Sequence, residues 1–216
     1  MDKKTVFSHV DHTLLKATAT WEEVSALCRE ALENGMATVC IPPYFVRMAK
    51  AEYPSLPVCT VIGFPLGYNT TAVKAAEAEQ ALREGADEID MVVNLGNVKA
   101  GRFDQVTEEI KKLKDIAGDK VLKVIVETCY LTEEEKIALC GCVTDGGADY
   151  IKTSTGFGTG GATLADIRLF QRHIGPGVKI KASGGIRTAE DMEAYLAEGV
   201  DRIGASAAIK AYADQD

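Results

Sequence analysis

Two lysines in this sequence stand where a buried amine could do covalent chemistry. Lys152 ends the apolar segment 149–152, and Lys181 lies near the end of the apolar segment 178–182. Burial disfavours the charged form of a lysine, and a second nearby cation disfavours it further, so both effects should lower its pKa. A neutral amine near pH 7 can attack an aldehyde and form an imine. The pair predicts a Schiff-base lysine; the alternative is a core cation neutralised by a carboxylate.

A carboxylate accompanies these lysines, because Asp90 lies within the apolar segment 87–93. Asp90 could simply neutralise a buried lysine. A carboxylate hydrogen-bonded to an ammonium can also pass protons through it or through a bound water, so the two roles are compatible. Four further polar residues lie in or at the ends of apolar segments, and we interpret them as structural support rather than catalytic groups: Asp11, His12, Lys123 and Glu127.

Three glycine-rich turns follow apolar segments and offer backbone N–H groups to an anion. They span residues 155–161, 183–186 and 204–206. In barrels of parallel strands, the loops after the last two strands and a helix N-terminus form the usual phosphate site. The turns therefore predict a phosphorylated substrate, although each one could be only a tight connection between a strand and a helix.

The elements that must position these residues recur along the chain. A helical pattern, a glycine, an acidic residue and a short apolar run follow one another at 84–87, 145–149 and 198–201, as expected where a helix leads into a buried strand. Helix starts fit a capping box or its aspartate variant at Thr20/Glu23, Thr132/Glu135, Thr163/Asp166 and Thr188/Asp191. We predict strands at 7–12, 37–41, 57–62, 87–93, 121–126, 149–152, 178–182 and 200–204.

Eight strand–helix units predict the α/β class and a single (β/α)8 TIM barrel, one domain spanning residues 1–216. Each unit has about 27 residues, which is close to the minimum for this fold and leaves no room for an inserted domain. A doubly wound open sheet is the main alternative. Its dinucleotide-binding form should carry G-x-G-x-x-G after the first strand, where this chain has Val10-Asp11-His12-Thr13.

The composition bounds the partners and the compartment. A net charge of −8 argues against nucleic acid or an anionic membrane as the main partner. No segment approaches the roughly 20 apolar residues of a membrane span, and the N-terminus lacks a signal peptide, so we expect a cytoplasmic protein. The six cysteines lack C-x-x-C spacing and are expected to be free buried thiols. A homodimer is the expected assembly, although barrel helices have apolar inner faces in monomers and dimers alike.

Three segments together resemble the signature strands of the deoxyribose-phosphate aldolase family. They are Glu88-Ile89-Asp90-Met91-Val92-Val93-Asn94, Ile151-Lys152-Thr153-Ser154-Thr155-Gly156-Phe157 and Lys181-Ala182-Ser183-Gly184-Gly185-Ile186-Arg187. The resemblance extends to residues 11–14 and 202–206 and so spans the chain. It implies reversible cleavage of 2-deoxy-D-ribose 5-phosphate to D-glyceraldehyde 3-phosphate and acetaldehyde, without a metal or an organic cofactor.

The resemblance also assigns roles to individual residues. Lys152 matches the Schiff-base lysine, and Lys181 and Asp90 match the lysine and the aspartate that tune it and relay protons. The positions that match phosphate-loop residues are Gly156, Gly184, Gly185 and Ser206. Ala207 stands where many members have a second serine, which implies one fewer side-chain contact to phosphate. The C-terminal segment 210–216 does not clearly match the tail whose terminal tyrosine reaches the site in some members, so Tyr212 is interpreted as a helix residue.

Two other functions remain open at this point. A different Schiff-base aldolase would share the lysine chemistry and differ in its donor, for example dihydroxyacetone or its phosphate in place of acetaldehyde. A catalytically silent barrel could bind a sugar phosphate as a sensor or scaffold. The combination of Lys152, Lys181 and Asp90 argues against the silent barrel, because a binding protein has no need of a neutral amine.

Overall fold

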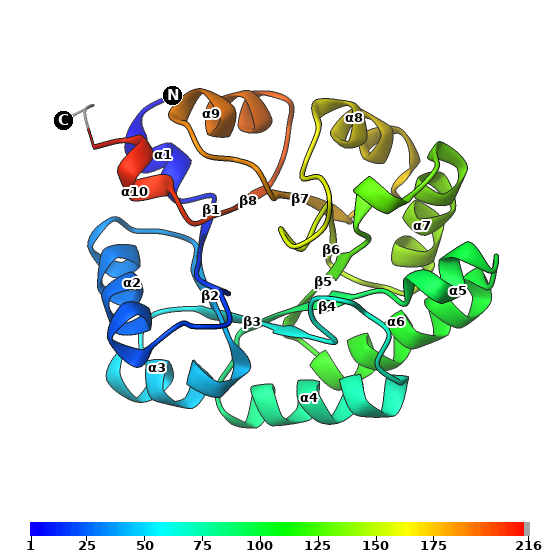
Figure 1. Cartoon of the computed structure of the whole chain (residues 1–216), viewed down its shortest axis with the longest axis horizontal. Helices are drawn as coiled ribbons and strands as arrows, with labels where there is room; N and C mark the ends of the chain where they lie inside the picture. The colour runs from blue at the N-terminus through cyan, green and yellow to red at the C-terminus, as the bar shows by residue number, and fades with distance from the viewer. Residues whose placement is uncertain (214–216) are drawn as a thin grey trace.

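Eight parallel strands pair in chain order in the computed structural model, which describes residues 1–213, and the sheet closes where β1 pairs with β8 (Figure 1). The strands are β1 (Val10–Thr13), β2 (Thr38–Ile41), β3 (Val58–Ile62), β4 (Glu88–Val92), β5 (Val121–Ile125), β6 (Tyr150–Lys152), β7 (Lys179–Ser183) and β8 (Arg202–Ala205). The closed order confirms the predicted TIM barrel and excludes the open doubly wound sheet.

Helices surround the barrel on its outer side (Figure 1). They are α1 (Lys3–Phe7), α2 (Trp21–Glu33), α3 (Val46–Glu52), α4 (Thr71–Arg83), α5 (Leu95–Lys99), α6 (Phe103–Ala117), α7 (Glu133–Asp145), α8 (Leu164–His173), α9 (Ala189–Ala197) and α10 (Ala208–Ala211), with 3-10 turns η1 (Pro43–Phe45) and η2 (Thr128–Tyr130). In the part of the chain that the structure describes, none of the helices has the length and hydropathy to cross a bilayer.

The predicted strand positions agree with the structure within one or two residues, except at the first strand. Residues Lys3–Phe7 form helix α1, and β1 begins only at Val10. The Asp2 carboxylate accepts a hydrogen bond from the Thr5 backbone N–H, and this N-cap starts a helix where the apolar pair Val6 and Phe7 suggested a strand. The prediction of a strand from residue 7 is therefore wrong.

The predicted helix starts are real N-caps. Thr20, Thr132 and Thr188 each form a complete capping box with the acidic residue three positions later. Thr163 also accepts from the Asp166 backbone N–H, but its hydroxyl donates to the Asp166 carboxylate instead of leaving that carboxylate free to close the box. Each cap fixes where a loop above the barrel ends and its helix begins.

The apolar core lies between the strands and the helices, whereas the barrel interior is filled with charged side chains. On β4, for example, Ile89 and Met91 join the apolar core, and Glu88 and Asp90, which alternate with them, face the opposite side of the strand. All residues of β4 are buried. The interior of this barrel is therefore a network of buried ion pairs, and the catalytic candidates belong to it.

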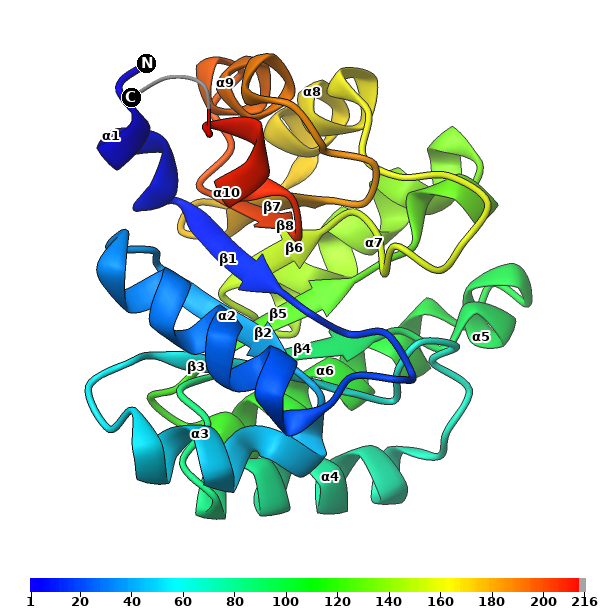
Figure 2. The ribbon, with the colours of Figure 1, turned by 60° about the vertical axis from the view of Figure 1, so that its left-hand side comes forward.

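The first and last helices of the described chain, α1 and α10, lie close together, as both views show (Figures 1 and 2). The rings of Phe7 in α1 and Tyr212 after α10 are 5.4 Å apart in an edge-to-face contact. Tyr212 is fully buried, and its hydroxyl donates to the Glu193 carboxylate at 3.2 Å. Tyr212 therefore has a structural role, because it packs the end of α10 against α1 and α9. The remaining tail, residues 214–216, lies outside the described chain.

Candidate active site

Strand register brings the three predicted catalytic residues together. Lys152 on β6 lies directly opposite Lys181 on β7, and Asp90 on β4 lies opposite Lys123 on β5. Residues that face one side of a pleated strand alternate, so these side chains all enter the barrel interior. The pairing explains how positions more than 60 residues apart in sequence form one cluster.

Asp90 is the centre of this cluster. Lys152 Nζ lies 2.6 Å and Lys181 Nζ lies 2.7 Å from the same oxygen, Oδ2. The other oxygen, Oδ1, accepts from Lys123 Nζ at 2.9 Å and from Cys59 Sγ at 3.1 Å. With four donors on two oxygens, the Asp90 carboxylate is fully solvated by the protein, which is the condition for burying a charge.

A second layer of charges supports the first. Asp11 lies 2.5 Å from Lys181 Nζ and 2.5 Å from Arg202, and Glu88 lies 2.5 Å from Lys123 and 3.2 Å from Arg202. Asp11 and Lys123, which we interpreted from the sequence as structural, are thus in direct contact with Lys181 and Asp90. This position fits residues that orient the predicted catalytic groups.

The other two polar residues singled out in the sequence lie elsewhere. His12 faces the outer side of β1, where its Nε2 meets the Glu30 carboxylate of α2 at 2.8 Å. Glu127 follows β5, and its buried carboxylate accepts from the backbone N–H of Thr155 at 3.1 Å and also binds the Thr155 hydroxyl. Glu127 therefore holds the loop after β6 in place, whereas His12 joins β1 to a helix.

The three lysines hold Asp90 in its charged form. Burial raises the pKa of Asp90, but the charges of Lys123, Lys152 and Lys181 lower it by more, so that it lies well below its ordinary range. Asp11 behaves in the same way, because Lys181, Lys123 and Arg202 outweigh its burial and lower its pKa. Both carboxylates are thus anions throughout the physiological pH range.

The expectation that burial and a neighbouring cation lower the pKa of both lysines is wrong for Lys181. Burial does lower its pKa, but the Asp11 and Asp90 carboxylates raise it by more, so the pKa lies above its ordinary value. Among residues 1–213, Asp90 is the one carboxylate in ion-pair contact with Lys152. Lys181 is therefore held as a cation by two carboxylates, those of Asp11 and Asp90. Lys152 forms its ion pair with Asp90.

A cavity of about 380 Å³ opens at the carboxyl ends of the strands, where barrel enzymes place their sites. Its wall includes Lys152 and all four predicted phosphate-site residues, namely Gly156, Gly184, Gly185 and Ser206. Asp90 and Lys181 have no solvent exposure and lie behind Lys152. The structure thus places the Lys152 amine at the cavity wall, in contact with the buried pair of Asp90 and Lys181.

Other lining residues were missed from the sequence. Thr13 ends β1 and Lys16 lies in the loop after it, whereas Phe157 and Arg187 come from the loops after β6 and β7. Their position directly after predicted strands was the available signal, because such loops meet at one end of a barrel. Cys59 and Arg202 were also missed, since only strand register shows that they face the interior.

The loops after β6 and β7 touch closely beside this cavity. Gly184 has φ +83°, and a Cβ on Gly161 would lie 2.1 Å from the Gly184 carbonyl oxygen. Only glycine fits at position 161, because a side chain there would collide with the neighbouring backbone. The two loops therefore pack backbone against backbone beside the cavity.

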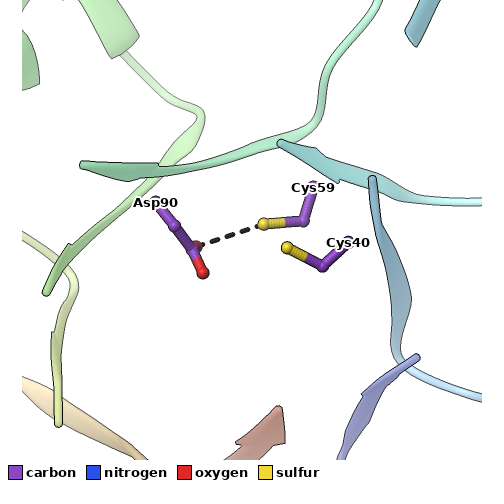
Figure 3. A group of neighbouring side chains, drawn as sticks. All are labelled: Cys40, Cys59 and Asp90. Atoms are coloured by element: carbon purple, nitrogen blue, oxygen red, sulfur yellow. Dashed lines mark hydrogen bonds between the residues drawn. The ribbon is translucent and has the colours of Figure 1, made fainter. Parts of the chain in front are cut away.

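Two groups of side chains in the barrel interior have metal-ligand chemistry, Cys40/Cys59/Asp90 and Asp11/Cys59/Glu88. The first group is shown in Figure 3. Asp90 is already bound by Lys123, Lys152 and Lys181 within 3 Å, and a divalent cation would have to displace them against their charge. The surrounding lysines therefore disfavour a metal at either group.

Fold stability should depend on pH through these ion pairs. The lowered pKa of Asp90 and Asp11 contributes stability that is complete above about pH 4, the unfolded value, and is lost as the pH falls further. The raised pKa of Lys181 contributes stability that is complete below about pH 10 and is lost above it. We expect urea midpoints to change little between about pH 5 and 9 and to fall on both sides. A steady fall from pH 7 to pH 5 would contradict this pairing.

Sequence and structure comparisons agree with this geometry. The model of the DeoC/LacD family aldolases matches residues 5–211. A deoxyribose-phosphate aldolase of Clostridium botulinum is 57% identical over 97% of this chain and 95% of its own length, and one of Clostridioides difficile is 53% identical over 99% and 98%. Among solved structures, the deoxyribose phosphate aldolase from Aeropyrum pernix has a TM-score of 0.89 at 33% identity, covering 99% of this chain and 92% of its own.

The chain therefore belongs to the DeoC/LacD family of aldolases. Within that family it is an enzyme of the deoxyribose-phosphate aldolase type, a carbon–carbon lyase on a TIM barrel.

Proposed function

We propose that this enzyme reversibly cleaves 2-deoxy-D-ribose 5-phosphate into D-glyceraldehyde 3-phosphate and acetaldehyde through an imine on Lys152. The observation that carries the proposal is the placement of Lys152 at the wall of the cavity, with its Nζ 2.6 Å from the buried Asp90. An amine in contact with both substrate space and a proton carrier can form an imine and exchange protons with it.

The shared oxygen of Asp90 provides the route for protons. Lys152 and Lys181 both contact Oδ2, and two ammonium groups on one oxygen repel each other, which favours loss of a proton from one of them. Asp11 also holds Lys181 as a cation, so we assign the nucleophile to Lys152, the amine that lines the cavity. Neutral Lys152 then attacks the C1 aldehyde, and loss of water gives a protonated imine.

The protonated imine is an electron sink for breaking the C2–C3 bond. A base must take the proton of the C3 hydroxyl as that bond breaks, and an acid must later protonate the enamine carbon before hydrolysis releases acetaldehyde. We assign this relay to Asp90 and Lys181 together with a water molecule. Asp90 Oδ2 lies 2.7 Å from Lys181 Nζ and 2.6 Å from Lys152 Nζ, so it connects the two amines. Their complete burial keeps bulk water from competing for these protons.

The far end of the cavity is suited to the substrate phosphate. Gly156, Gly184, Gly185 and Ser206 line the cavity, and backbone N–H groups of such loops can bind phosphate oxygens. Ala207 follows Ser206 and provides no hydroxyl. We therefore propose that phosphate is bound mainly by backbone groups, with Ser206 as the side-chain donor.

Replacing Ser206 by alanine should raise KM for 2-deoxy-D-ribose 5-phosphate roughly tenfold, because a hydrogen bond to a charged group is lost. Unphosphorylated 2-deoxy-D-ribose should be cleaved at the same kcat/KM by both proteins. Ser8→Ala, at an exposed serine that caps α1, is the control. An equal loss for both substrates would show that Ser206 does not act through phosphate.

The donor distinguishes this activity from that of other Schiff-base aldolases. The purified protein should condense D-glyceraldehyde 3-phosphate with acetaldehyde and should not use dihydroxyacetone or its phosphate as the donor. The opposite preference would contradict the proposed substrate while leaving the lysine chemistry intact. We further propose that the reaction needs neither a metal nor an organic cofactor, that it takes place in the cytoplasm, and that the enzyme is a homodimer.

A further inference from the structure

Two cysteines face each other inside the barrel, next to the catalytic cluster. Cys40 on β2 and Cys59 on β3 are direct partners in the strand register. Their sulfur atoms lie within 4.8 Å of each other and of Asp90, and Figure 3 shows both side chains on the interior side of their strands. Neighbouring strands are about 4.8 Å apart, which falls within the separation of Cα atoms that a disulfide can bridge.

The two thiols differ in reactivity. The neighbouring Cys59 side chain lowers the pKa of Cys40 against the effect of burial, and the charge of Lys181 lowers it further. Burial raises the pKa of Cys59 well above its ordinary value. A thiol with a lowered pKa beside a second thiol is the arrangement of redox-sensitive pairs, in which the first sulfur reacts and the second resolves the product.

Both thiols are buried, but they lie close to the cavity. Cys40, Cys59 and Val61 form a small apolar cluster against which the partly buried side chains of Leu15 and Phe64 pack. Leu15 itself lines the cavity. Leu15 therefore separates the thiols from the cavity, and a hydroperoxide, much smaller than a sugar phosphate, would reach Cys40 by passing this side chain.

We propose that Cys40 and Cys59 are an oxidation site, at which a hydroperoxide forms an intrachain disulfide inside the barrel and thereby slows the aldolase. The slowing rests on the proposed function, whereas the disulfide itself does not. The other cysteines lack a thiol partner on a neighbouring strand, within the described chain: Cys28, Cys140 and Cys142 lie on helices, and Cys129 lies in the 3-10 turn η2.

The reaction with hydrogen peroxide balances in two steps. The Cys40 thiolate attacks one peroxide oxygen and the O–O bond breaks, which gives a sulfenic acid on Cys40 and, with one proton, a water molecule. The Cys59 sulfur then attacks the Cys40 sulfur; the S–O bond breaks, and the hydroxide leaves as water with the Cys59 proton. Two thiols are oxidised by two electrons in all, and one peroxide is reduced to two waters.

The disulfide affects Asp90 directly. Cys59 donates its S–H to Asp90 Oδ1 at 3.1 Å, and a disulfide has no S–H. Asp90 would keep Lys123 on that oxygen but lose one of its four donors, and the Cys59 sulfur would move toward Cys40. Loss of a hydrogen bond to a buried charge that relays protons should lower kcat roughly tenfold.

The test uses the full chain with Cys129→Ser, which removes the partly exposed thiol and with it disulfides between molecules. The protein is treated with hydrogen peroxide, free thiols are blocked, and unreduced peptides are mapped by mass spectrometry while kcat is measured. We expect a linked pair of peptides containing Cys40 and Cys59 and a roughly tenfold lower kcat. Dithiothreitol should restore the free thiols and the original kcat. Cys59→Ala and Cys59→Val in the same background should lose the dithiothreitol-reversible slowing, whereas Cys28→Ala should keep it.

Each other outcome would overturn the proposal. Peroxide that leaves both thiols free, or that drives Cys40 to an irreversible acid without a linked peptide, rules out the disulfide. A linked peptide without a change in kcat rules out the regulatory effect. Reversible slowing that persists in both Cys59 variants shows that the effect does not require the disulfide between Cys40 and Cys59. If the untreated protein has no aldolase activity, the proposed function fails, and the peptide map still decides whether the disulfide forms.

Discussion

Replacing Lys152 by alanine lowers kcat for cleavage of 2-deoxy-D-ribose 5-phosphate by roughly 10,000-fold, because the group that forms the imine is gone. The fold should survive, since Lys152 lies at the cavity wall and removing its amine leaves Asp90 still bound by Lys123, Lys181 and Cys59. Steady-state kinetics measure the activity, and circular dichroism measures the fold.

Lys179→Ala is the matched control for Lys152→Ala. Lys179 begins β7, at the opposite end of the strand from the cavity, and is exposed. We expect its kcat to stay within about twofold of the wild type, as for other surface substitutions. A Lys152→Ala protein with more than about one tenth of the wild-type kcat would contradict an imine on this lysine.

Replacing Asp90 by asparagine affects both stability and turnover. The neutral amide would leave Lys123, Lys152 and Lys181 without their shared anion in the barrel interior, which should lower the free energy of unfolding by about 3–5 kcal/mol. The proton relay would also be lost, which should lower kcat by roughly 100-fold or more. Urea denaturation and steady-state kinetics measure the two effects separately.

Asp87→Asn separates these effects from loss of an ordinary ion pair. Asp87 pairs with Lys50 at 3.1 Å and Lys120 at 3.3 Å, but it is partly exposed, so we expect a stability loss of about 1–2 kcal/mol and an unchanged kcat. If Asp90→Asn were as mild as Asp87→Asn, the buried carboxylate could not be the centre of the site. Thermal denaturation at pH 7 gives an independent comparison.

The barrel and the three catalytic candidates could be predicted from the sequence because both depend on local patterns. Capping residues and short apolar runs mark each unit, and Lys152, Lys181 and Asp90 lie in strongly patterned segments. The first helix was missed because its apolar residues Val6 and Phe7 also suit a strand, and the deciding Asp2 cap is a single hydrogen bond.

The electrostatics of the site could not be predicted in the same way. The raised pKa of Lys181 depends on Asp11 from β1 and Asp90 from β4, and nothing local in the sequence places these carboxylates against the lysine. In the sequence, Cys59 likewise resembles the other apolar residues of β3. Only the strand register shows that it lies beside Asp90 and Cys40. Contacts between distant strands, not the residues themselves, were the missing information.

The most direct measurement of the central claim is borohydride trapping. The protein is incubated with acetaldehyde and sodium borohydride, and its peptides are mapped by mass spectrometry, with Lys152→Ala as the control. We predict a reduced two-carbon adduct on Lys152 that is absent from the control. A folded wild-type protein with no adduct, or with its adduct on Lys181, would contradict the assignment of the imine to Lys152.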